Sequence, residues 1–134
     1  MLIRSRLRRE DGQAAAEMAL VLPILAALML AIAQFGILFN NYVTLTDATR
    51  QGARKAAIAR FTGDQGAAAT ALVKSSATSL DWTKPGAGVT VTSTDWTTPG
   101  SDVTVTATYP YSIDILGLTV STGTLTSTTQ ERLE

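Results

Sequence analysis

A run of twenty-two residues without a charged side chain, from Met18 to Phe39, constrains the fold of this chain more than any other feature. As an α-helix the run would be about 33 Å long, which matches the hydrocarbon core of a bilayer. Its only clearly polar side chain is Gln34, so it has no polar stripe at helical spacing. Because a small soluble domain would have to bury every face of such a helix, a buried core helix is the weaker interpretation. The run predicts a transmembrane helix at about residues 18–39.

A short basic segment precedes this helix. The segment covers residues 1–12, ends in Gly12 and contains Arg4, Arg6, Arg8 and Arg9. Glu17 is the fifth residue after Gly12. Positive charges at one end of a membrane helix hold that end in the cytoplasm, so the C-terminus is predicted to be extracytoplasmic. A basic leader, a glycine, a glutamate at this spacing and a membrane-length helix are together similar to the substrates of prepilin peptidases. The order predicts cleavage between Gly12 and Gln13.

Two other interpretations of the N-terminal region stay open. Ala31-Ile32-Ala33 has the small residues that signal peptidase requires, so the chain could be secreted after a cut behind Ala33. Against this, the apolar stretch before that site is long for a signal peptide, and Glu17 stands where its apolar region would begin. In the other alternative, the leader is never removed and the chain is a single-pass membrane protein with an extracytoplasmic binding domain. The mature mass separates the two cuts, which lie twenty-one residues apart.

The residue types that the chain lacks narrow its chemistry. It contains no cysteine and no histidine, which removes disulfides, thiol chemistry, the commonest general base and the commonest metal ligand. The acidic residues after the apolar run are scattered among predicted turns rather than paired. We therefore expect no enzymatic activity, no metal site and no cofactor.

The formal net charge of zero hides an asymmetry along the chain. The leader carries four arginines against Glu10 and Asp11, a balance of +2, so the remainder of the chain has a net charge of −2. The basic residues that follow the apolar run most closely are only Arg50, Arg54, Lys55 and Arg60. Because nucleic acid binding needs a dense basic face, we expect no nucleic acid partner.

The helix is predicted to continue beyond the membrane, from Gln13 to about Arg60, because no proline interrupts the helix-forming residues that follow the apolar run. In this extension, small and apolar residues recur at three- and four-residue spacing, which suits close approach of a neighbouring element. They are Tyr42, Leu45, Thr49, Gly52, Ala53 and Ala56. Residues 61–66 then break the helix, and Thr62 with Gln65 is predicted to form a capping box for a second helix from Ala67 to about Leu80.

An internal repeat begins where the composition changes to threonine, valine, glycine and proline. Residues 81–92 and 95–106 are identical at nine of twelve positions. Each copy joins a Pro-Gly turn to a Val-Thr alternation, which is typical of a strand with one apolar face. Two copies predict a hairpin of antiparallel strands, with a third strand at 119–129. The valines and the alanine predicted to face the helix are Val89, Val91, Val103, Val105 and Ala107. A weaker interpretation is that Trp82 and Trp96 bind carbohydrate.

These elements predict an α+β fold in three parts. Residues 1–12 form a basic leader, residues 13–60 form a long helix that is half in lipid, and residues 61–134 form a small extracytoplasmic domain. The domain combines the short second helix with a C-terminal antiparallel sheet that packs on the outer half of the long helix. That arrangement is the general plan of type IV pilins and pseudopilins.

Two spaced motifs carry a more specific resemblance. Residues 11–23 read DGQAAAEMALVLP, and residues 47–54 read DATRQGAR. The first is similar to the Gly-x4-Glu core and following Ala-Leu-Val-Leu-Pro of the TadE-like family, and the second is similar to the Ala-x-Arg-x-Gly-Ala-Arg motif that follows the membrane segment in that family. The chain resembles these minor pilins or pseudopilins of the tight-adherence (Tad/Flp) pilus over about residues 8–59.

The resemblance implies a place in a bacterial inner membrane and in assembly of a Tad/Flp-type pilus for adherence or secretion. The implied partners are a prepilin peptidase, other pilin or TadE- and TadF-like subunits, the pilus assembly platform and membrane lipid. Two features depart from ordinary type IV pilins. Gln13 stands where the new N-terminus is usually aromatic, which puts methylation of that amine in doubt, and no cysteine pair closes a C-terminal loop.

Glu17 is the predicted assembly residue. A carboxylate in the centre of a membrane helix costs about 2.5–3.5 kcal/mol on insertion scales, and less near the interface. Cleavage after Gly12 would leave Gln13 with a free amine, and the carboxylate of one subunit could then pair with the amine of its neighbour. Pro23 is predicted to kink the helix, because it removes a backbone donor and frees the carbonyl of Ala19. We also expect Arg50, Gly52 and Arg54 to include partner contacts.

Overall fold

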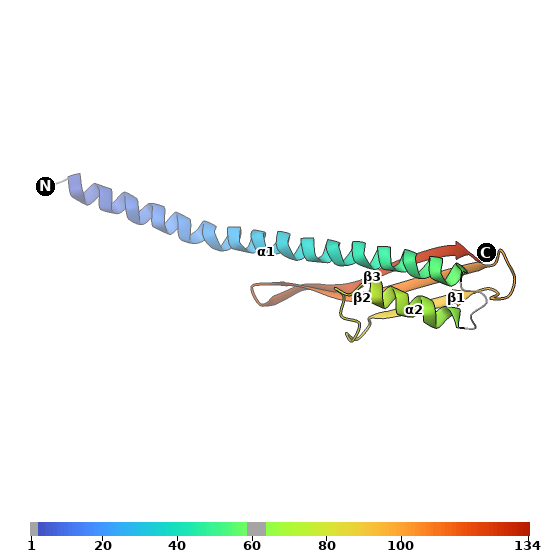
Figure 1. Ribbon diagram of the computed structural model, residues 1–134. Helices are drawn as coiled ribbons and strands as arrows, with labels where there is room; N and C mark the ends of the chain where they lie inside the picture. Colours follow the sequence, from blue (N-terminus) through green and yellow to red (C-terminus); the bar gives the residue numbers. More distant parts are fainter. Residues whose placement is uncertain (1–2, 59–63) are drawn as a thin grey trace.

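The structure is a computed structural model that describes the backbone of residues 3–58 and 64–134, and the side chains of these ranges from Gly12 onward. Its elements are α1 (Ile3–Ile58), α2 (Gln65–Ser76), β1 (Gly88–Ser93), β2 (Asp102–Ile115) and β3 (Leu118–Arg132). Figure 1 shows a long α1 whose C-terminal half carries α2 and the sheet. The strands form one antiparallel sheet in the order β1-β2-β3. The predicted α+β, pilin-like fold is confirmed.

Helix α1 begins earlier than predicted, at Ile3 rather than at Gln13. The leader contains four arginines, two leucines and one glutamate, which are good helix formers. The single Gly12 costs only about 1 kcal/mol relative to alanine. The helix also runs through Pro23 without interruption and ends at Ile58. Residues 59–60, where the sequence predicted the end of this helix, lie outside the described part of the chain.

The predicted cap and bounds of the second helix are wrong. Helix α2 starts at Gln65, and its N-cap is Asp64, whose carboxylate accepts a hydrogen bond from the Ala67 backbone N–H at 3.2 Å. Thr62, the predicted cap, lies outside the described residues. The helix stops at Ser76 because serine and threonine are poor helix formers and compete for backbone hydrogen bonds. The backbone N–H of Ala77 closes the end by donating to Val73 O at 3.1 Å.

The internal repeat builds the predicted hairpin. Strands β1 and β2 pair antiparallel, with Val89 opposite Ala107 and Val91 opposite Val105. In β2 every second side chain from Val103 to Tyr109 is buried, as the period-two pattern requires. Strand β3 occupies the predicted third position but is longer, because β2 continues to Ile115 and pairs with it along its length.

The domain core lies between α1, α2 and the sheet, and α1 contributes mostly small side chains to it. Of the predicted stripe, every residue from Leu45 onward is buried, whereas Tyr42 is exposed. The closest approach is at Gly52, where a Cβ atom would clash with Val73 Cγ2 and lie 3.3 Å from Ala69 O. Glycine at this position therefore permits the packing of α2 on α1.

The repeated Asp-Trp-Thr segments form equivalent turns. Asp81 Oδ1 accepts from the backbone N–H and the hydroxyl of Thr83, and Asp95 Oδ1 does the same with Thr97. A further hydroxyl, from Thr98, binds the second Asp95 oxygen. These bonds, that of Thr98 first, lower the pKa of Asp95 to about 2, because each favours the ionised carboxyl.

Both repeat tryptophans are half-buried against the core rather than displayed as a binding surface. Trp82 Nε1 donates to Ala77 O at 3.2 Å, and its ring meets the Tyr109 ring edge-to-face with centroids 6.4 Å apart. Packing and hydrogen bonding thus account for Trp82, and packing accounts for Trp96. Nothing in this arrangement supports the carbohydrate-binding interpretation.

Candidate functional site

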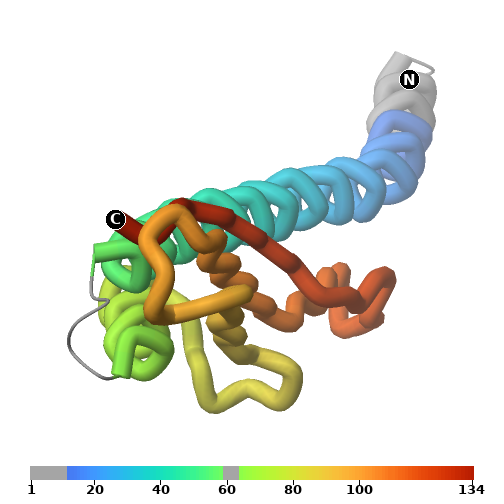
Figure 2. The backbone as a smooth tube through the Cα atoms, turned by 90° about the vertical axis from the view of Figure 1, so that its right-hand side faces the viewer, coloured from blue at the N-terminus to red at the C-terminus, as the bar shows by residue number. Residues whose placement is uncertain are grey.

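The N-terminal half of α1 is not covered by the domain. Figure 2 shows it projecting away from the rest of the chain, with its first part inclined to the remainder. Its large apolar side chains from Met18 to Ile37 are exposed, from 41% at Leu30 to 74% at Leu20. Among the described residues, α1 from Gly12 onward is the one helix that is long and apolar enough to cross a membrane. Such a surface requires lipid or neighbouring apolar helices around it.

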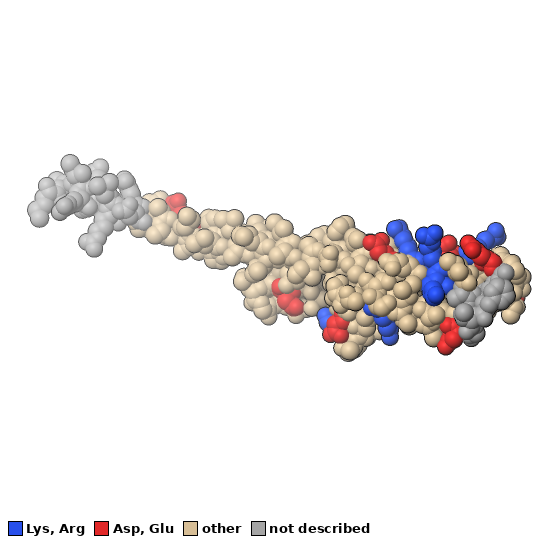
Figure 3. Space-filling model, viewed as in Figure 1, with Lys and Arg blue, Asp and Glu red and all other residues tan. Residues whose placement is uncertain are grey.

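The predicted cleavage and assembly residues lie at the far end of this uncovered half. Gly12, Gln13 and Glu17 are all exposed on α1. The Gln13 side-chain amide donates to Glu17 Oε1 at 3.2 Å, one helical turn away. Figure 3 shows charged groups gathered over the domain and almost none along the uncovered half. Glu17 therefore has no cation beside it within the described part of the chain, and its carboxylate is open to a partner from outside.

Pro23 lies inside the uncovered half of α1 and is itself exposed. A proline here removes one backbone donor and leaves a carbonyl in the preceding turn without its helical partner. In lipid such a group requires a neighbour, water or a local adjustment of the helix. The predicted kink at Pro23 stays a prediction.

The three residues predicted to include partner contacts do not share one surface. Arg50 and Arg54 are exposed, and Arg50 forms an ion pair with Asp47 at 3.8 Å. That pair is open to solvent and is worth at most about 0.5 kcal/mol. Gly52 instead faces α2 and is buried within the chain. Its small size is explained by internal packing, so Gly52 is removed from the set of surface contacts.

The sequence did not predict that the β2–β3 hairpin reaches back along α1. Gln34, the polar residue of the apolar run, donates from its side-chain amide to Asp114 O at 3.2 Å. The hairpin turn is made by Leu116 and Gly117, which both have positive φ (52° and 81°). Only Gly117 fits the residue preference of such a two-residue turn, because asparagine, aspartate or glycine is preferred at the position that Leu116 occupies.

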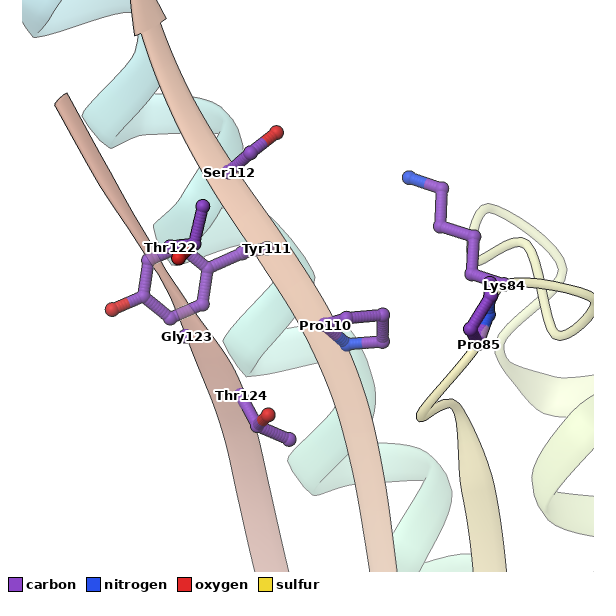
Figure 4. Close-up of a pocket in the computed structure, with 8 residues that line it drawn as sticks. All are labelled: Lys84, Pro85, Pro110, Tyr111, Ser112, Thr122, Gly123 and Thr124. Carbon is purple, nitrogen blue, oxygen red and sulfur yellow. The ribbon is translucent and has the colours of Figure 1, made fainter. Parts of the chain in front are cut away.

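Two hollows flank the hairpin where it leaves the domain. Figure 4 shows the larger one, of about 570 Å³, between Lys84-Pro85 and the facing segments of β2 and β3. Its floor includes the Tyr111 ring, which lies over Gly123 on the neighbouring strand. A second hollow of about 120 Å³ lies between α1 and β2 and is also bordered by Lys84. The Lys84 ammonium is 5.4 Å from the Tyr109 ring centroid.

These hollows offer binding groups rather than a reactive centre. Lys84 and two tyrosines are the titratable residues among those that line them. Within the described ranges, no three acidic side chains lie close enough together to hold a metal ion. The chemistry available here is hydrogen bonding and attraction of an anion to one ammonium group.

Comparison with known proteins identifies the helical part of the chain. Residues 12–54 match the family described as TadE-like protein, and so form a TadE-like family domain. The matched segment contains Gly12, Gln13, Glu17 and Pro23 together with the Arg50–Arg54 motif. No curated protein and no solved structure is significantly similar to the chain. The family match covers 43 of the 134 residues, all of them in α1, and the long apolar α1 is consistent with single-pass membrane anchoring.

Proposed function

We propose that this chain is a minor pilin or pseudopilin of a Tad/Flp-type pilus, with a structural rather than a catalytic role. A prepilin peptidase cuts it between Gly12 and Gln13 at the cytoplasmic face of the membrane. The mature chain then joins other pilin or TadE- and TadF-like subunits at the pilus assembly platform. The observation that carries this proposal is the uncovered apolar half of α1, which begins at Gly12 and Glu17 inside the TadE-like domain.

The uncovered half of α1 suits both states of such a subunit. Before assembly its exposed apolar side chains lie in lipid, and afterwards they pack against the helices of neighbouring subunits. Glu17 supplies the polar element of that contact. Because its carboxylate is exposed and bonded only to Gln13 within the described chain, the free amine of a neighbouring mature subunit can reach it. Pairing neutralises a charge that is unfavourable in an apolar surrounding.

The N-terminus of the mature protein tests the cleavage step. The full chain is expressed with and without the peptidase, and the mass and N-terminal sequence of the product are measured. We expect a chain that begins at Gln13 only when the peptidase is present. A chain that begins directly after Ala33 would identify a secreted protein, and an intact leader in both conditions would identify an uncleaved membrane anchor. Either result contradicts the proposal.

Variants at Glu17 test the assembly step separately from cleavage. Glu17→Ala and the nearly isosteric Glu17→Gln are both expected to be cut normally but to be lost from the pilus fraction. Met18→Ala, which removes bulk from the adjacent position, is the matched control and is expected to assemble. If Glu17→Gln enters pili as well as the wild-type chain does, the charge at Glu17 is not required and the pairing is wrong.

A further inference from the structure

The tip of the β2–β3 hairpin combines two unusual features. Leu116 has a left-handed backbone with φ 52°, at a turn position where asparagine, aspartate or glycine is preferred. Leu116, Leu118 and Val120 are also 65%, 73% and 64% exposed. Among the described residues after Ile58, these three are the large hydrophobic side chains that stand open. A leucine placed at such a position, with two further apolar side chains beside it, indicates a contact surface.

The position of the tip indicates what this surface contacts. Gln34 Nε2 donates to the backbone oxygen of Asp114, so the tip lies against the apolar half of α1 rather than at the free end of the domain. Figure 1 shows the hairpin running alongside α1 toward the N-terminus of that helix. The exposed tip residues therefore lie at the level of the apolar half of α1. If α1 spans a membrane, as the proposed function requires, the tip meets the same membrane.

The depth of the tip follows from helix and strand dimensions. Gln34 precedes Phe39, the last residue of the uncharged run, by five residues, or about 7–8 Å along the helix. Leu116 lies two residues beyond Asp114, or about 6–7 Å further along the strand direction. If all of residues 18–39 lay in the hydrocarbon layer, the unpaired edges of the hairpin beside Gln34 would lie in that layer as well. Unpaired strand edges exposed to lipid do not occur in the hydrocarbon layer.

The tip and Gln34 are therefore expected at the boundary between headgroups and acyl chains, where peptide groups stay hydrated and apolar side chains enter lipid to about 5–10 Å. The spanning segment then lies nearer to residues 14–33. These twenty residues give a helix of about 30 Å, which fits the hydrocarbon core. Glu17 lies about one turn inside the cytoplasmic boundary of that segment.

Charged and polar groups near the hairpin agree with this depth. Lys84 borders the hollow that is also lined by Leu38 and Asn41 of α1, one to two turns beyond Gln34 toward the domain. At that level its ammonium faces the headgroup layer, where it is attracted to lipid phosphates. The one acid at the tip, Asp114, is held by hydrogen bonds from the hydroxyls of Ser112 at 3.1 Å and Thr119 at 2.6 Å.

We propose that the β2–β3 hairpin tip is an interfacial membrane contact: Leu116, Leu118 and Val120 enter the outer headgroup–acyl boundary beside α1 and set the depth of that helix. The inference rests on the proposed membrane anchoring of α1 and adds a second contact from a distant part of the chain. Lipid is favoured over a second copy of the chain because the tip lies beside the apolar half of α1 at the level of Gln34, where the same membrane would surround both.

Depth-dependent fluorescence quenching tests this contact in the full chain. The protein has no cysteine, so single cysteines placed at exposed positions report one site each. The variants Leu118→Cys and Val120→Cys carry an environment-sensitive dye in vesicles of phosphatidylethanolamine and phosphatidylglycerol. The vesicles also contain a lipid with a nitroxide either near the headgroup or near the acyl terminus. Ile24→Cys on the uncovered half of α1 and Ser75→Cys on α2 are the reference sites.

We expect both tip sites to show blue-shifted emission and a larger loss of fluorescence with the shallow nitroxide than with the deep one. The order should be reversed at Ile24→Cys, and Ser75→Cys should not be quenched. If Ile24→Cys is not quenched, α1 does not span and the proposed anchoring fails. If Ile24→Cys is quenched but the tip sites are not, or if the tip sites are quenched mainly by the deep nitroxide, the interfacial contact alone is wrong.

A charge variant and a dilution series complete the test. Leu118→Asp is expected to reduce shallow quenching of a dye at Val120→Cys, because an added negative charge is repelled from the anionic surface. Thr126→Asp, an exposed site on the same strand further from the tip, should leave it unchanged. If quenching by lipid is absent and the dye instead changes with the number of protein chains per vesicle, the tip contacts a second copy and the proposal is overturned.

Discussion

Replacing Gly52 by alanine directly tests how α2 packs on α1. The added Cβ would clash with Val73 Cγ2, because it would lie well inside the separation of about 3.5–4.0 Å that is optimal for two carbons. Val73 is fully buried and β-branched on a helix, so it has no easy alternative rotamer. Overpacking of a core costs about 1–3 kcal/mol, and exchanging a helical glycine for alanine returns about 1 kcal/mol. Since the clash is severe, we expect Gly52→Ala to lower the free energy of unfolding by about 1–2 kcal/mol.

A second substitution separates the clash from any general sensitivity of α1. Val73→Ala removes the atom that the new Cβ would meet, and only the 3.3 Å contact with Ala69 O stays close. In the Val73→Ala background, Gly52→Ala is therefore expected to be neutral or to stabilise by up to about 1 kcal/mol. The expected change of sign is the signature of the packing contact. Gly66→Ala, where a Cβ meets only Val91 Cβ at 4.0 Å, is the matched control.

The unfolding assay uses the two tryptophans, because both pack against the domain core. Urea unfolding of the full chain in detergent micelles is followed by tryptophan fluorescence, with circular dichroism as a second probe of two-state behaviour. If Gly52→Ala stabilises the wild-type chain as much as Gly66→Ala does, then the close approach of the two helices is not part of the folded protein and the reasoning is refuted.

Three further changes test other local contacts. Asp64→Ala should cost about 1 kcal/mol in the same unfolding assay through loss of the α2 cap, whereas Ser75→Ala on the exposed face of that helix should be nearly neutral. The carboxyl of Asp95 should titrate near pH 2 when followed by NMR. Its contribution to stability is therefore present above the ordinary aspartate pKa and is lost as the pH falls through about 2. If Asp95 titrates at the ordinary aspartate pKa, the turn hydrogen bonds do not form. Gly123→Ala would place a Cβ 2.8 Å from the Tyr111 hydroxyl oxygen, and it should alter the tyrosine near-UV signal with less destabilisation than Gly52→Ala, because Tyr111 is only half-buried and can move.

Most of the fold could be predicted from periodicity, because the spacing of apolar residues depends on which faces of a helix or strand are buried. The apolar run is apolar on every face, which predicts a membrane helix. The Val-Thr alternation of the repeat is apolar on one side only, which predicts strands with that side toward the core. The small residues from Leu45 to Ala56 likewise predicted a close neighbour, although not which one. The structure identifies it as α2, with the sheet next to it.

What the sequence could not predict depends on contacts between distant segments or on competing local signals. Thr62 with Gln65 has the spacing of a capping box. The N-cap of α2 is instead Asp64, whose carboxylate accepts a hydrogen bond from the Ala67 backbone N–H. Gln34 looked like an isolated polar group in an apolar helix until Asp114, eighty residues later, supplied its acceptor. Gly52 shares a sequence motif with Arg50 and Arg54, but the helical geometry turns it toward α2 while both arginines face solvent.

The two halves of α1 differ in whether their side chains pack within the chain itself or are left for contacts with lipid and other molecules. From Leu45 onward its small side chains are held by the chain's own domain. Under the proposed function, their packing therefore persists whether the subunit is in lipid or in a filament. The large apolar side chains from Met18 to Ile37 are exposed and have no such partner. Under the proposed function, they can pass from lipid to neighbouring helices without unfolding the domain. Glu17 lies twenty-eight residues before Leu45, about 42 Å along the helix, so the proposed cleavage and charge pairing are separated from the domain core. A substitution at Glu17 should therefore leave the tryptophan unfolding curve unchanged, and Gly52→Ala should leave cleavage unchanged. Coupling between the two measurements would show that α1 does not divide in this way.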